Sequence, residues 1–147
     1  MPQDHIGAHN MTQSDKRETQ PSVQGVALIV GGGPGISSSC ARLFAEYGMR
    51  VAVAARNPEK PVLEKLEKEH DVRRYACDAS EPAAVAQLFE NVVRDIGTPR
   101  LVVHNIDGRI PGILRKTLVE VDPPMVFDTI RNAAFSAFLV GQQAARR

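Results

Sequence analysis

The sequence predicts an α/β fold, in which helices cover both faces of a parallel sheet. Residues 26–30 and 51–54 are short, continuous apolar runs, typical of strands that are buried on both faces. These runs alternate with segments in which apolar residues recur every three or four positions, as in amphipathic helices. Such alternation implies right-handed crossovers between parallel strands.

The first three crossover segments carry clear start and stop signals. The first helix is expected over residues 36–47 and should end at Gly48. A short helix over 61–70 has a proline in its first turn, where proline is tolerated. After a strand at 72–76, a third helix should begin near 81–82 with Ser80 as its cap. The predicted buried face of the first helix consists of Ile36, Cys40, Leu43, Phe44 and Tyr47.

The last part of the chain predicts a fourth strand at 101–104, a loop rich in Gly and Pro, and a final helix from about residue 124. Asp122 is a candidate cap for that helix. The four strands are expected in the order 3-2-1-4. Since the sequence stops after this helix, the expected fold is a doubly wound parallel sheet truncated after the fourth strand and the fourth long helix.

Composition and charge narrow the class of protein. Residues 1–24 are polar and aperiodic and are expected to be a disordered tail, with one domain over 25–147. The net charge of +1 is too balanced to imply a nucleic-acid partner or an acidic membrane surface. No apolar run approaches the roughly 18 residues of a membrane span, and no signal peptide is recognisable. A cytoplasmic protein is therefore expected, with Cys40 and Cys77 as ordinary buried thiols.

A glycine-rich loop joins the first strand to the first helix. It reads Gly-Gly-Gly-Pro-Gly-Ile-Ser over residues 31–37. Glycine lets a pyrophosphate approach the backbone N–H groups, and the helix start adds free donors and the positive end of its dipole. The predicted cofactor-binding residues in this Rossmann-type loop are Gly31, Gly33, Gly35 and Ile36. The alternative is a purely structural turn. No Gly-Lys-Ser/Thr follows, which argues against a P-loop nucleotide hydrolase.

The end of the second strand favours NADP over NAD. An acidic residue at this place would bond the ribose 2′-hydroxyl of NAD, but the strand ends in Arg56, which suits a 2′-phosphate. An ordinary exposed arginine is the alternative. At the end of the third strand, Asp78 and Ala79 are predicted to lie beside the adenine, although Asp78 could equally just start the next turn.

Together these segments resemble the short-chain dehydrogenase/reductase family over residues 26–147. Residues 30–37 resemble its cofactor loop, 55–56 its NADP-preferring strand end and 77–79 its adenine-side Asp. Residues 103–108 resemble its Asn-Asn-Ala-Gly segment, in which Asn105 keeps its place, and 135–142 resemble its fourth long helix. The resemblance implies an oxidoreductase that moves hydride between NADP(H) and a small carbonyl or alcohol substrate, with a homo-oligomer formed through the last helix.

Several positions depart from the family pattern. Ser37 replaces the last glycine of the loop, and Ile106 and Asp107 stand where the family has Ala and Gly, so they could crowd or repel the cofactor. A gap-free reading places the family's catalytic Asn at Ala133, whereas Asn132 lies one residue early, or about 100° around a helix. The alternative is that Asn132 is the same residue in a shifted register. His104, at a strand end, is expected to be an ordinary polar residue, and Lys60 part of a solvated charge run.

The family's catalytic Ser and Tyr-x-x-x-Lys have no counterpart in the 147 residues. The two tyrosines are Tyr47 and Tyr75, and neither has Lys four positions later. No catalytic residue and no metal site is therefore assigned. Three functions remain open: an NADP(H)-dependent oxidoreductase by resemblance, which this chain alone would not complete, a non-catalytic dinucleotide-binding module, and an inert fragment of a longer reductase.

Overall fold

The computed structural model describes residues 23–147, so most of the polar segment 1–24 lies outside the described part of the chain. Four parallel strands form one sheet: β1 (Val26–Val30), β2 (Arg50–Ala55), β3 (Arg73–Ala76) and β4 (Pro99–His104). Their order is β3-β2-β1-β4, which confirms the predicted order and the α/β class. The sheet therefore changes direction of winding at β1, between β2 and β4.

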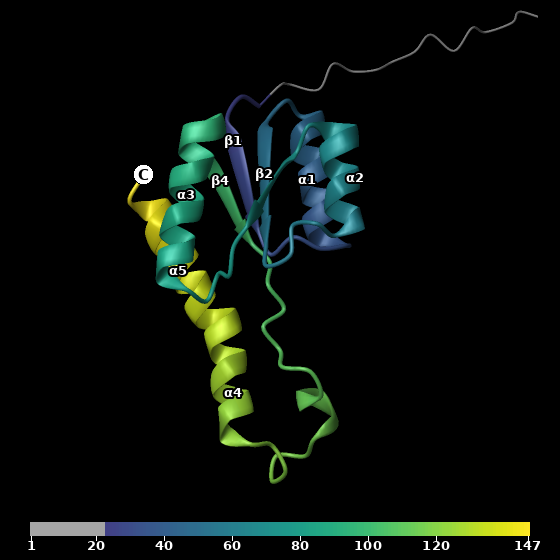
Figure 1. Cartoon of the computed structure of the whole chain (residues 1–147), viewed down its shortest axis with the longest axis vertical. Helices are drawn as coiled ribbons and strands as arrows, with labels where there is room; N and C mark the ends of the chain where they lie inside the picture. The colour runs from purple at the N-terminus through teal and green to yellow at the C-terminus, as the bar shows by residue number, and fades with distance from the viewer. Residues whose placement is uncertain (1–22) are drawn as a thin grey trace, which may run out of the picture.

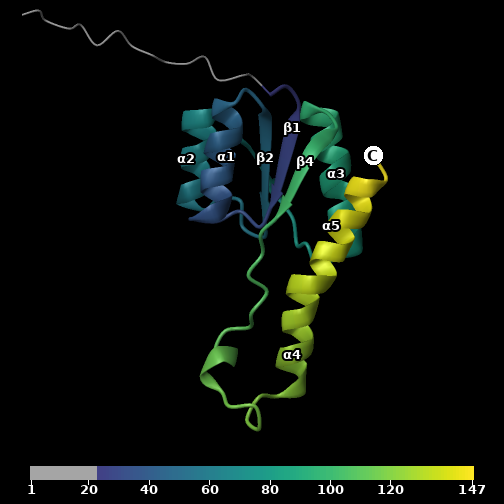
Figure 2. The same ribbon diagram turned by 180° about the vertical axis from the view of Figure 1, so that it is seen from behind.

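Helices cover both faces of the sheet. The helices α1 (Ile36–Glu46) and α2 (Pro61–His70) lie on one face, and α3 (Pro82–Ile96) and α5 (Ser136–Ala145) lie on the other (Figures 1 and 2). The central strands β1 and β2 divide their side chains between them: Ala27 and Ile29 of β1 pack toward α1 and α2, while Leu28 and Val30 pack toward α3 and α5. This two-sided burial explains why β1 is apolar throughout and why β2 is apolar after Arg50, whereas β3 and β4 contain polar residues.

The segment between β4 and α5 extends away from the sheet (Figures 1 and 2). It contains a short 3-10 helix, η1 (Ile113–Arg115), and the helix α4 (Pro123–Ile130). A π-helical turn, η2 (Arg131–Phe135), joins α4 directly to α5. Within residues 23–147, no helix combines the length and the apolar character that a membrane crossing requires.

The predicted buried face of α1 is partly wrong. Ile36 and Leu43 are exposed, whereas Ser37, Ser38 and Ala41 are buried. Small residues allow the start of α1 to approach the sheet closely, and the serine hydroxyls are satisfied by carbonyls of the glycine loop. The apolar spacing of the helix was therefore a poorer guide than the small residues beside the loop.

Two predicted helix caps also differ in the structure. Ser80 does not cap α3, because the N-cap position falls on Glu81 and the Ser80 hydroxyl donates instead to Asp78. Asp122 does occupy the N-cap position of α4, but its carboxylate accepts a hydrogen bond from Lys116 rather than from the helix backbone. In both cases the side chain bonds to another side chain instead of the helix backbone.

Candidate functional site

A cavity of about 340 Å³ lies where the loops leave the carboxyl ends of the four strands. This volume is within the range of small-molecule sites, and the switch point of an α/β sheet is where such sites form. The lining comes from the glycine loop (Val30, Gly31, Gly32, Gly33, Pro34, Ser37), from β2 and the turn after it (Ala54, Ala55, Arg56, Lys60), from the segment after β3 (Cys77, Asp78, Ala79, Ser80), and from Asn105, Ile106, Asp107 and Asn132.

Two glycines of the loop are required by the backbone itself. Gly31 has φ +106°, and a Cβ there would lie 2.2 Å from the carbonyl oxygen of Asn105. Gly35 has φ +88°, which L side chains rarely adopt. Gly33 differs from both, because its φ is not positive and a Cβ would meet nothing within 4 Å. Its lack of a side chain therefore leaves space open for a ligand without being required by the fold.

Buried serines hold the carbonyl groups of the loop. The Ser37 hydroxyl accepts a hydrogen bond from Asn105 Nδ2 at 2.9 Å and donates to the Gly31 carbonyl at 2.8 Å. The Ser38 hydroxyl donates to the Gly33 carbonyl at 2.7 Å. Ser37 is thus accommodated in place of the family's glycine, since its hydroxyl is fully satisfied in the contact between β1, α1 and the end of β4.

The N–H groups at the start of α1 remain free. Within residues 23–147, the backbone N–H groups of Gly33, Gly35 and Ile36 donate no hydrogen bond to the protein. Free donors at a helix N-terminus, next to the positive end of the helix dipole, form an anion-binding site. The cavity reaches Gly33, but Gly35 and Ile36 are not among its lining residues, and Ile36 is 65% exposed.

The far end of the cavity, beside β2 and β3, carries both signs of charge. Arg56 and Lys60 line it together with Asp78 and Ala79. Asp78 Oδ1 accepts hydrogen bonds from the backbone N–H and the hydroxyl of Ser80, at 3.0 and 2.8 Å. Burial raises the pKa of Asp78, but the Ser80 hydrogen bonds and the charge of Arg56 outweigh it and lower the pKa overall. Asp78 is therefore an ionised carboxylate that organises the turn and still lines the cavity.

Cys77 lines the same end of the cavity. Burial, helped by the neighbouring Asp78, raises the pKa of its thiol to about 11. Cys77 is therefore a neutral, apolar part of the wall at neutral pH. Residues 23–147 contain no cluster of three or more potential metal ligands.

Ile106 and Asp107, which replace the Ala and Gly of the family pattern, line the cavity at the end of β4. Arg109 donates to Asp107 through Nε, at 2.7 Å, and through a second guanidinium nitrogen. These hydrogen bonds lower the pKa of Asp107 to about 2. The carboxylate is thus ionised but paired with a cation, which weakens the repulsion that it would exert on an anionic ligand.

The π-helical turn places Asn132 in the cavity. Asn132 is a lining residue and Ala133 is not; the Asn132 amide lies 3.5 Å from the Gly108 carbonyl. A π-turn holds one more residue than an α-turn, so it shifts the helical register by one position. This shift provides a physical reason why the gap-free reading pointed to Ala133.

His104, at the end of β4, is linked to the π-helical turn through Ser136. Its Nε2 lies 2.8 Å from the hydroxyl of the fully buried Ser136, which donates to the Asn132 carbonyl at 2.5 Å. Burial lowers the pKa of His104. His104 therefore connects the end of β4 with the helix that carries Asn132, rather than lying free at the strand end.

Sequence reasoning missed two contributors to the site. Lys60 was grouped with a solvated charge run, yet its Nζ donates to the Gly32 carbonyl at 3.1 Å. Ser37 was considered only for its size, yet it bonds Asn105 to the loop. Pro61 at the first position of α2 was the available signal for Lys60, because it places Lys60 at the N-cap, next to the loop.

Comparison with known proteins agrees with this architecture. Residues 31–147 match the family model described as enoyl-(acyl carrier protein) reductase. The chain is 37% identical to an uncharacterized oxidoreductase of Caenorhabditis elegans over 93 residues, which cover 56% of this chain and 28% of that protein. It is 30% identical to the human 3-oxoacyl-[acyl-carrier-protein] reductase over 95 residues, covering 65% of this chain and 40% of that enzyme.

The chain belongs to the short-chain dehydrogenase/reductase family. Solved structures of low sequence identity share its fold. A short-chain dehydrogenase from Burkholderia cenocepacia in complex with NADP is 20% identical, with a TM-score of 0.72 over 82% of this chain and 49% of that one. A candidate D-mannonate oxidoreductase from Haemophilus influenza with bound NAD is 16% identical, with a TM-score of 0.76 over 86% and 51%. The match thus covers about half of each of these two solved chains, and 28% and 40% of the two curated relatives.

Proposed function

We propose that this chain binds NADP(H) and forms the cofactor-binding part of an oxidoreductase acting on a small carbonyl or alcohol. The observation that carries the proposal is the cavity at the strand ends, with the free N–H group of Gly33 at one side, next to those of Gly35 and Ile36, and Arg56 at the other. Pyrophosphate would lie on the donors of the glycine loop, and a 2′-phosphate would lie by Arg56. The short-chain dehydrogenase of similar fold with bound NADP supports this choice, although the oxidoreductase of similar fold holds NAD.

The residues of the cavity divide the work of binding. Gly33 leaves room for the phosphates, and the Ser37–Asn105 contact fixes the loop against β4. Asp78 and Ala79 would form the wall beside the adenine, and Asn132 would lie at the end of the cavity that takes the nicotinamide. Bound NADPH would supply the hydride, while these residues position it.

We also propose that the 147 residues alone bind the cofactor without turning it over. Neither tyrosine lines the cavity. Tyr75 donates to Asp95 at 3.1 Å, and burial together with this bond raises its pKa to about 12. A general acid must reach the substrate, and no tyrosine among residues 23–147 does so. Purified chain should therefore oxidise no NADPH with a panel of aldehydes and ketones; turnover that survives repurification would refute this.

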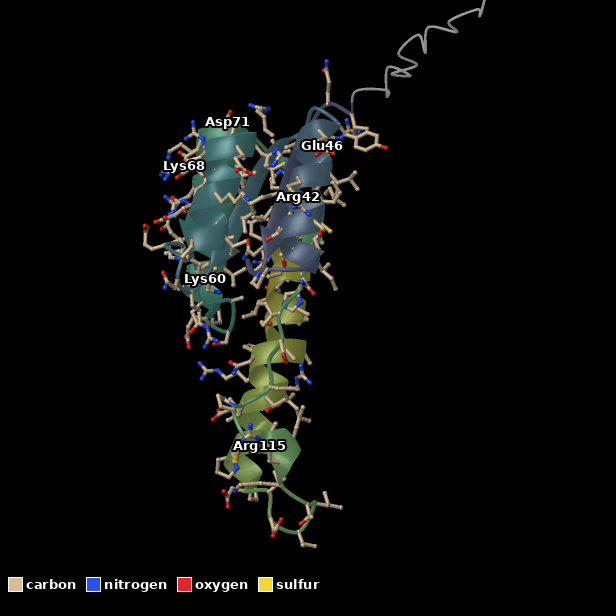
Figure 3. All side chains as sticks on the ribbon, turned by 90° about the vertical axis from the view of Figure 1, so that its right-hand side faces the viewer. Arg42, Glu46, Lys60, Lys68, Asp71 and Arg115 are labelled. Atoms are coloured by element: carbon tan, nitrogen blue, oxygen red, sulfur yellow. The ribbon has the colours of Figure 1, made fainter. Side chains whose placement is uncertain are left out.

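The test of the binding proposal is a calorimetric titration with NADP and with NAD. Wild-type chain should bind NADP more tightly by about tenfold to a hundredfold, since charge-assisted hydrogen bonds to an exposed arginine contribute about 1–3 kcal/mol. Arg56→Ala should weaken the binding of NADP and leave the affinity for NAD nearly unchanged. Arg42→Ala, on the exposed surface of α1 (Figure 3), is the matched control and should change neither. Equal affinities of the wild type would remove Arg56 from the site.

A further inference from the structure

Lys60 links α2 to the glycine loop. Its backbone is extended, with φ −64° and ψ 136°, and forms the N-cap of α2. Figure 3 shows Lys60 at the end of α2 nearest the projecting α4 segment, while Lys68 and Asp71 lie at the opposite end. From there the ammonium group reaches the Gly32 carbonyl at 3.1 Å. Gly32 also packs on α2 itself, because a Cβ at Gly32 would lie 3.1 Å from Leu63 Cδ1.

The ammonium group of Lys60 keeps capacity for a second partner. An ammonium has three N–H donors, and the Gly32 carbonyl accepts only one of them. Among residues 23–147, no carboxylate lies within ion-pair distance of either Lys60 or Arg56. Both cations line the cavity, and the carboxylate that lines it beside them, Asp78, bonds to Ser80 and forms no ion pair with either cation.

The turn between Arg56 and Lys60 contains one acidic residue, Glu59, whose carboxylate bonds to a residue outside the cavity. Asn57 Oδ1 accepts a hydrogen bond from the Glu59 backbone N–H at 3.0 Å, which closes the turn after Arg56. The Glu59 carboxylate pairs with Arg74 of β3, at 3.4 Å. Arg74 therefore holds the nearest carboxylate of the turn, while Arg56 and Lys60 both line the cavity.

We propose that Lys60 is a second specificity-determining residue, which acts with Arg56 on a phosphate at the ribose 2′ position. The inference rests on the proposed NADP site. The Gly32 carbonyl holds the ammonium in place before the ligand arrives, which reduces the side-chain entropy that binding costs. Lys60 thereby connects the loop for the pyrophosphate with the pocket for the 2′-phosphate.

The experiment compares two probes that differ only in the 2′-phosphate, adenosine 2′,5′-bisphosphate and adenosine 5′-monophosphate, on the full chain by calorimetry. In Lys60→Gln the side chain keeps an N–H donor, one bond nearer the backbone than in lysine, but the charge is gone. This variant should lower the ratio of bisphosphate affinity to monophosphate affinity by about threefold to tenfold. The affinity for the monophosphate itself should change by less than about twofold. Lys60→Arg should retain most of the ratio, and raising the salt concentration should reduce the effect.

Lys68→Met is the matched control, because this exposed lysine lies on the same helix at the end away from the cavity. It should leave both affinities unchanged. If Lys60 served only to hold the loop, Lys60→Gln would weaken both probes equally and leave their ratio intact, which would overturn the inference. Wild-type chain that binds both probes equally would instead overturn the proposed NADP preference itself.

Discussion

Gly33→Ala separates ligand binding from folding at the glycine loop. Its backbone is outside the left-handed region, and an added Cβ would meet no atom of the described chain within 4 Å. The substitution should therefore leave the fold intact and even stabilise it by about 0.4–1 kcal/mol, because alanine has less freedom in the unfolded chain. The new methyl group would stand in the cavity that Gly33 lines.

The expected effect on binding follows from hydrogen-bond geometry. A phosphate oxygen accepts from a backbone N–H at about 2.9 Å, and a methyl group between them prevents this approach. Losing one such charge-assisted bond costs about 1.5–3 kcal/mol, or roughly a tenfold to hundredfold rise in Kd for NADP. Calorimetry measures the Kd, and urea denaturation measures stability. An unchanged Kd in a folded Gly33→Ala chain would refute phosphate binding at this loop.

Three further substitutions test the framework of the site. Gly31→Ala should destabilise the chain by more than about 2 kcal/mol in urea denaturation, because its φ is +106° and its Cβ would lie 2.2 Å from the Asn105 carbonyl oxygen. Ser37→Ala should cost about 1–3 kcal/mol in the same assay, since it leaves the Asn105 amide and the Gly31 carbonyl without their partner. His104→Gln should flatten the dependence of stability on pH below about 6.5.

The sign of the His104 effect follows from its lowered pKa. Burial favours the neutral imidazole in the folded chain, so the unfolded chain takes up a proton first as the pH falls. Stability is therefore lost as the pH falls through the unfolded pKa toward the folded one. Equal slopes for wild type and His104→Gln between pH 7 and 5 would contradict this assignment, and wild-type stability in Gly31→Ala or Ser37→Ala would contradict the packing at the loop.

The sequence predicted the sheet well because periodicity reports burial directly. Strands covered on both faces are apolar, and this signal placed β1 and β2, while the strand order followed from the doubly wound topology of dinucleotide-binding folds. The buried face of α1 was predicted less well. There the sheet accepts Ser37 and Ser38 because loop carbonyls satisfy their hydroxyls, and a hydropathy pattern contains no information about such partners.

The candidate site shows the same division. The glycines and Arg56 were recognisable, since backbone conformation and charge at a strand end follow from position in the chain. Lys60 was missed and Asn132 was left as an alternative to Ala133, because each reaches the cavity through a local feature of the backbone: an extended N-cap for Lys60 and a π-turn for Asn132. Such features depend on tertiary packing rather than on residue type alone.

The π-turn also has a consequence for insertions and deletions in this helix. Its upstream end is held by the ion pair of Arg131 with Glu81, and its downstream end by the buried Ser136. Deleting one residue within 131–135 would restore an ordinary α-helical ladder, but it would turn one held end by about 100° and draw it along the axis by about 1.5 Å. Residues on the two sides of this turn are therefore separated by one more position in the sequence than their places along an α-helix would require.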